Sequence, residues 1–536
     1  MQLQILPEKL QDTVILNTID FEQFHQDKAS VVQETNSILS KLVKKGFIAC
    51  ELKNLDLKER LYTAYFDVGS KVDSVVFQSE SILDTKTLEK FQIKKTKNTY
   101  TITYSLLEDF LNHLSKSFYQ IGDPFATVKL SNIRQEDNFL FADLLISLSE
   151  KPRRIDQIYM KGYDKFPQGF IEHGLGLSKG DLFTEEVLTN SEAIVSSIPF
   201  VGQIKSPEVL FSKDSTYLYY FLEKKKSSFF DGMIGFTSDN EENNLIFNGY
   251  LDLRLVNIFN SGETTQIFWQ NNGQNRREFK FYSQWPYVFK SKFSTELHFD
   301  LYQQDSTFNQ IATLAGLSYP IKQHARIGFL FDYSKSNKLA STTTDQVQSF
   351  DRIGFRIHYN FHRPLENNLL WNKYFLETEL LFANRKAETT SNEQLLLRLR
   401  NNYTFQLYPR VYLFTQFQGA YLFSDELITN EQFRIGGTET IRGFQEQVFF
   451  TDVYGIINLE ARFRTNTSDY FHTVTDIAYL QNSILNSNNT LLSVGLGYVL
   501  TTKIGKIQLI YAIGKTDQQS FDFSRSAFHI KVQNNF

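Results

Sequence analysis

Three groups of residues in this 536-residue chain have types and spacings that suggest chemistry. The first is GLSKG (residues 176–180), which matches the G-x-S-x-G pattern of a nucleophile elbow. That motif requires a buried strand before the serine and a large α/β sheet around it. Here the pattern of an amphipathic helix follows within a small unit, so we interpret the segment as a turn.

The second group is His358 and His362, which have the spacing of two metal ligands on one helix face. They lie in an alternating, strand-like segment, where four residues span about 13 Å. At that distance they cannot share one metal ion, and we predict that both are solvated. The sequence contains no P-loop, dinucleotide fingerprint or Cys/His cluster. We therefore predict a protein that is not an enzyme, with no catalytic residues, metal or cofactor.

The third group is FRIGGTETIRGFQEQ (residues 433–447), which lies between two strand patterns. The glycines at 436, 437 and 443 indicate a tightly folded loop. An arginine in such a loop, here Arg442, requires a carboxylate partner if it is removed from water.

The two strand patterns that follow supply candidate partners. Apolar residues alternate with polar ones in INLEARFR (457–464) and HTVTDIAYL (472–480), so Glu460 and Asp476 lie on the polar faces of their strands. We predict that the loop folds inward and that Arg442 pairs with Glu460 and Asp476. The alternative is an exposed loop with an unpaired arginine.

These strands belong to a long region of period-two alternation that covers residues 227–536. In RIGFRIHYNFH (352–362), aliphatic and aromatic residues alternate with arginine, histidine and asparagine. We count roughly sixteen such runs, separated by short polar breaks, and a transmembrane β-barrel has an even number of tilted strands with this alternation. The 50 Phe and 27 Tyr in a chain that is only 41% hydrophobic favour the same class. A large soluble β-structure is the alternative.

Composition excludes several other classes of protein. The 56 basic and 60 acidic residues give a net charge of −4, which argues against a nucleic-acid scaffold. No apolar run approaches the roughly 18–20 residues of a membrane helix, and 15% aromatic residues exclude a disordered chain. The single cysteine, Cys50, permits no intrachain disulfide.

Residues before 227 mix the periods of helices and strands. Amphipathic helix patterns at 31–47, 105–124 and 184–198 each have strand-like segments beside them. We predict three small β–α–β–β units at 1–69, 70–151 and 152–226, followed by the barrel at 227–536. The first residues lack the charged and apolar regions of a signal peptide, so we expect that such a peptide is absent from this sequence.

The glycine-rich loop resembles a signature of the BamA/TamA superfamily of outer-membrane assembly and translocation barrels. The matching positions are Ile441, Arg442, Gly443 and Phe444, the upstream pair Gly436 and Gly437, and the acidic residues Glu460 and Asp476. The last strand resembles the C-terminal strand signal of the family, with Phe528, Ile530, Val532 and the terminal aromatic Phe536. The three N-terminal units resemble POTRA domains, the third most clearly.

The resemblance implies a transmembrane β-barrel of about 16 antiparallel strands in the outer membrane of a diderm bacterium, preceded by periplasmic POTRA-like domains. It implies insertion or translocation of client polypeptides by strand pairing at the barrel seam and at POTRA edges. Expected partners are client outer-membrane or secreted polypeptides, periplasmic or inner-membrane accessory proteins, lipid and lipopolysaccharide, but no nucleic acid. The alternative is a two-partner-secretion transporter that exports one dedicated protein through the lumen.

Overall fold

The computed structural model describes residues 1–80, 83–238, 245–271, 276–322, 324–339, 346–365, 368–466, 468–502 and 506–535. Packing divides the chain into two compact units. One contains residues 1–157 with the short segments 179–189 and 210–217, and the other contains 158–178, 190–209 and 218–536. The domain boundaries expected from the sequence remain predictions.

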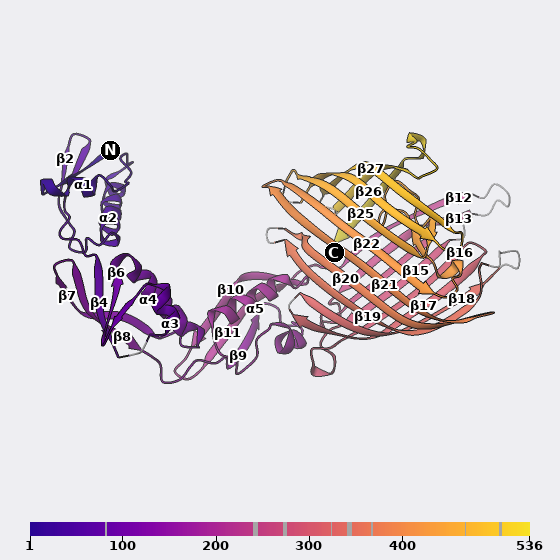
Figure 1. Cartoon of the computed structure of the whole chain (residues 1–536), viewed down its shortest axis with the longest axis horizontal. Helices are drawn as coiled ribbons and strands as arrows, with labels where there is room; N and C mark the ends of the chain where they lie inside the picture. The colour runs from indigo at the N-terminus through magenta and orange to yellow at the C-terminus, as the bar shows by residue number, and fades with distance from the viewer. Residues whose placement is uncertain are drawn as a thin grey trace. The chain divides into compact units, whose positions relative to one another are not determined.

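Sixteen strands in the described part of the chain form one closed antiparallel barrel (Figure 1). Each strand pairs with the next in sequence, except that a long loop separates β22 from β25. In order, the strands are β12 (Phe229–Ser238), β13 (Leu245–Val256), β14 (Thr264–Asn271), β15 (Arg277–Trp285), β16 (Ser294–Gln304), β17 (Phe308–Lys322), β18 (Ala325–Lys338), β19 (Phe350–Leu365), β20 (Asn368–Ala387), β21 (Ser391–Tyr408), β22 (Val411–Ser424), β25 (Val453–Arg464), β26 (Tyr470–Asn482), β27 (Ser487–Thr501), β28 (Lys506–Lys515) and β29 (Ala527–Asn535).

The barrel has the two faces that period-two alternation requires. On β19, Ile353 and Phe355 are exposed on the outside, whereas Arg352 and His358 are buried on the inside. The apolar face therefore points outward, as in a membrane barrel, and the charged face lines the lumen. Among the residues that the structure describes, no helix is long and apolar enough to cross a bilayer.

The first N-terminal sheet has the order β1–β3–β2, with β1 (Gln2–Pro7) parallel to β3 (Leu61–Asp67) and β2 (Glu51–Lys58) antiparallel to it. Helix α2 (Lys28–Lys44) begins at a capping box in which Asp27 and Ser30 exchange hydrogen bonds. Its apolar stripe, spaced three and four residues apart, packs in the core with strand residues. The buried residues of this core include Leu3, Val31, Ile38, Leu42, Phe47, Tyr62 and Phe66.

The second sheet has the order β5–β6–β4–β8–β7. Its strands are β4 (Ser74–Ser79), β5 (Lys94–Thr96), β6 (Thr99–Thr103), β7 (Thr127–Glu136) and β8 (Phe139–Ser147), and its helices are α3 (Thr85–Lys90) and α4 (Leu107–Gln120). Phe77 packs against Tyr100 and Phe110 in the core between helix α4 and the sheet. Strands β4 and β8 are parallel, so this sheet is mixed, as is the first.

The third sheet has the order β10–β11–β9, with β9 (Gln157–Lys161), β10 (Val201–Phe211) and β11 (Thr216–Lys224). Helix α5 (Glu185–Ser197) and a short π-helix, η3 (Phe170–Gly174), accompany it. The hydroxyls of Ser191 and Tyr220 are 2.5 Å apart in the core, and burial raises the pKa of Tyr220 to about 12. Like the first two sheets, this one is small, and its outer strands, β10 and β9, both pair with the central strand β11.

Candidate functional site

The glycine-rich segment lies in a loop that joins β22 to β25, here called the lumen loop (residues 425–452). It contains a 3-10 turn, η5 (Thr429–Glu431), and a small hairpin of β23 (Phe433–Ile435) and β24 (Phe449–Thr451). Ile457 and Ile477, on the flanking strands, are exposed on the outer face, so Glu460 and Asp476 lie on the inner face. The loop therefore folds into the barrel and contacts its charged lining.

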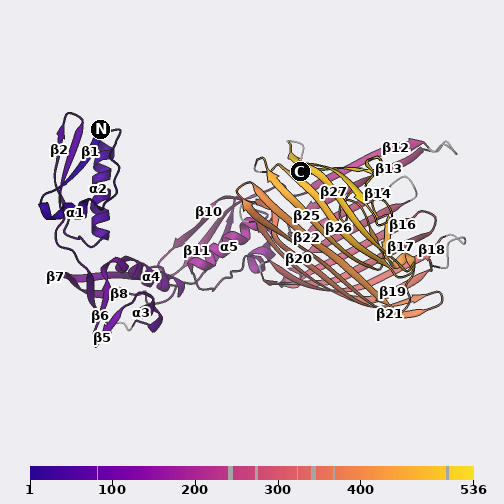
Figure 2. The same ribbon diagram turned by 45° about the horizontal axis from the view of Figure 1, so that its top comes forward.

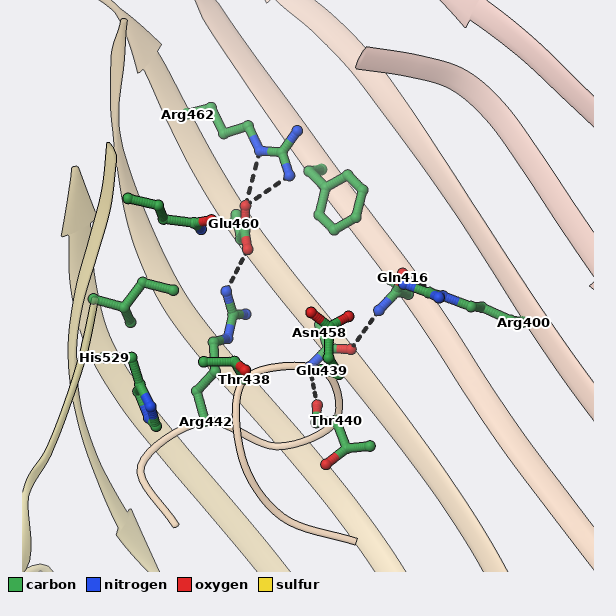
Figure 3. A pocket seen from close by; sticks show the side chains of 13 residues that line it. Arg400, Gln416, Thr438, Glu439, Thr440, Arg442, Asn458, Glu460, Arg462 and His529 are labelled. Atoms are coloured by element: carbon green, nitrogen blue, oxygen red, sulfur yellow. Dashed lines mark hydrogen bonds and ion pairs between the residues drawn. The ribbon is translucent and has the colours of Figure 1, made fainter. Parts of the chain in front are cut away.

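Arg442 is held by two carboxylates, those of Glu460 (Figure 3) and Asp476. Its Nε donates to Asp476 Oδ2 at 2.9 Å and its Nη2 donates to Oδ1 at 2.6 Å. Its Nη1 donates to Glu460 Oε1, and its backbone N–H donates to Asp476 Oδ2 at 2.9 Å. Arg442, Glu460 and Asp476 are only 5%, 7% and 0% exposed. The arrangement is a buried, bidentate ion pair with a second carboxylate attached, which restricts both the position and the orientation of the guanidinium.

Two further residues complete this cluster and were not singled out from the sequence. Arg462 Nε donates to Glu460 Oε2 at 2.8 Å, and its guanidinium lies 4.0 Å from the centre of the Phe414 ring. His472 Nδ1 is 3.8 Å from the same carboxylate. Alternation could have found Arg462, because it lies two residues after Glu460 and so on the same face. The two arginines balance the two carboxylates, so the cluster is neutral when His472 is neutral.

The glycines allow the loop to turn sharply and to approach the wall. Gly436, Gly437 and Gly443 have φ values of 131°, 95° and 82°, which disfavour any residue with a side chain. A Cβ on Gly443 would lie 2.8 Å from Ser493 Oγ and 2.9 Å from the carbonyl carbon of Ile513. This part of the loop therefore rests directly on β27 and β28.

Apolar residues of the motif anchor the same end of the loop. Ile441 is fully buried in a cluster with Ile435, Ile456 and Leu480. The Phe444 ring packs edge-on against Phe449, with centroids 5.4 Å apart, and it covers Gly514 of β28. The motif thus combines a charged contact with β25 and β26 and an apolar contact with β28.

A polar cavity of about 180 Å³ lies beside Arg442 in the lumen (Figure 3). Its lining includes Arg400, Gln416, Asn458, Arg462 and His529. Gln416 Nε2 donates to Asn458 Oδ1, and Asn458 Nδ2 donates to the carbonyl of Thr440 in the loop. These groups hold the loop by hydrogen bonds. In the described ranges, no three His, Cys, Asp or Glu residues are grouped so that they could hold a metal ion.

The two histidines interpreted above lie apart on β19. His358 is buried, with its Nε2 3.1 Å from Glu296 Oε2 on β16, so the prediction that it is solvated was wrong. His358 is opposite Gly328 of β18, and a Cβ at that glycine would lie 1.8 Å from His358 Nε2. The glycine therefore leaves room for the ring to lie over β18 and to reach Glu296. His362 is exposed and contacts Asn372 Oδ1 through its Nε2.

The residues of the C-terminal signal lie on β29, where the barrel closes. Phe528 and Ile530 are exposed on the outer face, at 61% and 57%. Val532 is opposite Ile507 of β28, and Phe536 lies outside the described residues. Among the described residues, two pairs join β29 to β12, Phe229 with Asn535 and Phe230 with Asn534, whereas seven pairs join β29 to β28. Figure 2 shows β12 and β13 beside the C-terminal strands.

No protein-family model and no curated protein matches this sequence. Solved structures do match. CdiB from Escherichia coli aligns with a TM-score of 0.55 and 11% identity over 95% of this chain and 98% of CdiB. CdiB from Acinetobacter baumannii aligns with a TM-score of 0.53 and 13% identity over 96% and 100%. BamA from Haemophilus ducreyi lacking POTRA domains 1–3 aligns with a TM-score of 0.51 and 12% identity over 85% and 98%.

At these identities the likeness is one of fold. The chain has the fold of BamA and CdiB, in which small α+β domains precede a 16-stranded barrel. The prediction of the fold class is therefore confirmed.

Proposed function

We propose that this protein is an outer-membrane barrel that inserts or translocates other polypeptides, and that client strands pair at the seam between β12 and β29. The observation that carries the proposal is the pairing at this seam. Two residue pairs connect the first and last strands, although the structure describes ten residues of β12 and nine of β29.

Incomplete pairing has a defined consequence in a membrane. Backbone N–H and C=O groups that have no partner in hydrocarbon cost several kcal/mol each, and an unpaired edge is a template for another strand. A client strand that pairs with β12 or β29 satisfies these groups. The seam therefore supplies a driving force for strand addition without nucleotide or cofactor.

Strand length differs around the barrel in a way that favours the same role. On the β12 side of the seam, the described parts of β14 and β15 have 8 and 9 residues, whereas β20 and β21 have 20 and 18 described residues. A short hydrophobic span forces the bilayer to thin or otherwise adapt. We infer that the bilayer is easiest to disturb beside the seam, where a client would enter.

The N-terminal sheets suit the capture of extended polypeptides before they reach the barrel. Strands β2, β7 and β10 lie at the edges of their sheets. An extended peptide can add to such an edge through main-chain hydrogen bonds. We propose that these sheets lie in the periplasm, where they bind clients or accessory proteins, and that lipid and lipopolysaccharide surround the barrel.

The alternative function is export of one dedicated protein through the lumen by a two-partner-secretion transporter. The alignment with CdiB over nearly the whole of both chains favours it. Such a route requires the lumen loop to move, because Arg442 and its partners fix the loop inside the barrel. The two candidate functions thus differ in which part of the barrel opens.

Depletion of the protein in its host distinguishes them. Outer-membrane and secreted proteomes are compared before and after depletion. Loss of many barrel proteins from the membrane is the result expected for an assembly factor. Loss of a single large secreted protein, with membrane barrels unchanged, would instead support the transporter.

A further inference from the structure

The lumen loop is attached to the barrel at a second place, far from Arg442 in sequence. Its first residues, 425–432, are here called the stem. Glu431 in the stem and Arg385 on β20 are both buried, with Arg385 Nε 3.7 Å from Glu431 Oε2. Arg385 Nη2 also donates to the carbonyl of Glu426 at 2.6 Å. Glu431 Oε2 accepts from Gln394 Nε2 of β21 at 2.8 Å.

The stem also bonds to β18 and to the segment that follows it. Asn430 Nδ2 donates to Ser336 Oγ and to the carbonyl of Gln348, both at 2.8 Å. The backbone N–H of Thr429 donates to the carbonyl of Gln346 at 2.8 Å. Ile428 is buried with Phe350 and Ala387. The stem is thus bound to four successive strands, β18 to β21.

Strand direction places the stem at one mouth of the barrel. The strands alternate in direction, so β12, β18, β20 and β22 all run away from the end where the chain enters β12. Ser336 and Arg385 lie within two residues of the ends of β18 and β20. The stem therefore lies at the mouth opposite the chain entry, here called the far mouth.

Other parts of the loop reach the remaining side of this mouth. The guanidinium of Arg434 stacks 3.5 Å from the ring centre of Tyr302, near the end of β16. Gln447 Nε2 donates to Glu278 Oε2 on β15 at 3.3 Å. The loop therefore crosses the far mouth from the β22 side to β15 and β16.

We propose that Glu431 and Arg385 form a second lock, separate from the Arg442 cluster, that holds the stem across the far mouth and closes the lumen there. The two locks share no residue and use different strands, β20 and β21 for Glu431 and β25 and β26 for Arg442. Gly436 and Gly437 lie between them in the sequence, at positive φ values that favour glycine. Release of Arg442 therefore frees the middle of the loop but leaves the far mouth closed.

The test measures ion conductance of the full chain in planar bilayers. The double variant R385M/E431Q removes both buried charges together, so that neither is left unpaired. We expect its mean conductance to exceed that of the wild type at least threefold. D425N, which removes an exposed carboxylate from the same stem, is the matched control and should conduct as the wild type does. R442K should change conductance less than R385M/E431Q.

A reversible crosslink separates closure of the mouth from a general effect on folding. In R385M/E431Q, with Cys50 replaced by serine, Asn430→Cys and Ser336→Cys are joined by a short reducible thiol crosslinker. Crosslinking should restore the low conductance, and reduction should raise it again in the same molecules. If the double variant does not fold, N430A alone is measured instead. We expect its mean conductance to exceed that of the wild type by less than the double variant's would. Equal conductance of wild type and every folded stem variant, or a crosslink without effect, would overturn the proposal.

Discussion

The seam between β12 and β29 and the wall between β19 and β20 belong to the same closed sheet but differ in backbone pairing. In the part of the chain that the structure describes, two residue pairs join the seam strands, and sixteen join β19 to β20. In lipid, each missing pair leaves polar groups without a partner. Backbone pairing, and with it the resistance to separation of neighbouring strands, is therefore uneven around the barrel. It is lowest between the first strand, β12, and the last strand, β29.

The lumen loop adds to this asymmetry. Arg442 and Phe444 bind it to β25, β26 and β28, on the C-terminal side of the barrel. Glu431 binds it to β20 and β21, beside the wall. One loop thus supports the strands that lead to the seam and the strands opposite them, by two ion pairs that do not share a residue.

The largest expected effect comes from closing the seam covalently. A disulfide between Phe230→Cys and Asn534→Cys, which face each other across the seam, should reduce client assembly more than tenfold, because β12 and β29 can no longer accept a strand. Assembly is measured in cells with and without reductant. Tyr374→Cys with Tyr403→Cys, a facing pair on β20 and β21 next to the wall, is the control. Full activity of the locked seam would contradict strand addition and favour passage through the lumen.

The next largest effect is expected from Arg442. Arg442→Met leaves Asp476 buried without its arginine partner and Glu460 with Arg462 alone. Loss of one member of a buried ion pair costs about 3–5 kcal/mol. Urea unfolding, followed by the heat-modifiable mobility of the folded barrel on gels, measures the change. Asp476→Asn should show a similar loss, and Arg442→Met/Asp476→Asn should lose less than the sum of both. Unchanged unfolding and full activity of Arg442→Met would show that the pair contributes nothing.

A smaller effect is expected from adding a side chain to a glycine, which should destabilise the barrel more in the wall than beside the seam. A Cβ on Gly354 of β19 would lie 2.6 Å from the Cβ of Ala383, whereas one on Gly232 of β12 would lie 3.0 Å from the carbonyl oxygen of Tyr250. Overpacking costs about 1–3 kcal/mol, so Gly354→Val should destabilise the barrel and Gly232→Val should have less effect. Equal losses in urea unfolding would mean that packing is uniform around the sheet.

The smallest effect is expected from Asp123, which lies in the N-terminal part of the chain, before the barrel. Its carboxylate accepts hydrogen bonds from the N–H and Oγ of Ser149, both at 2.7 Å. Burial disfavours its ionised form, but these hydrogen bonds outweigh burial and hold the pKa of Asp123 below its ordinary value.

A lowered folded-state pKa means that this stabilisation is present above the unfolded-state pKa and is lost as pH falls through the folded value. Limited proteolysis between residues 120 and 152 should therefore increase slightly between pH 7 and about pH 3. Asp123→Asn should reduce the pH dependence, while the barrel keeps its heat-modifiable mobility. An identical pH profile for both proteins would contradict this role of Asp123.

Much of the barrel and of the candidate site could be predicted from the period-two alternation of apolar and polar residues. Alternation alone places Glu460, Asp476 and Arg462 on the inner face, because side chains of a strand point to opposite sides in turn. The glycines at 436, 437 and 443 indicate sharp turns from local sterics alone. These are short-range properties, and they hold wherever the strands lie in the sheet.

The tertiary structure decided which residues meet. Glu431 and Arg385 are 46 positions apart and belong to a turn and a strand, so no local period relates them. The burial of His358 against Glu296, on another strand, has the same origin. The pairing at the seam depends on strands about 300 residues apart and on the register that the closed sheet imposes on them. Such contacts arise only when the barrel closes, because closure fixes how far each strand is displaced along its neighbour.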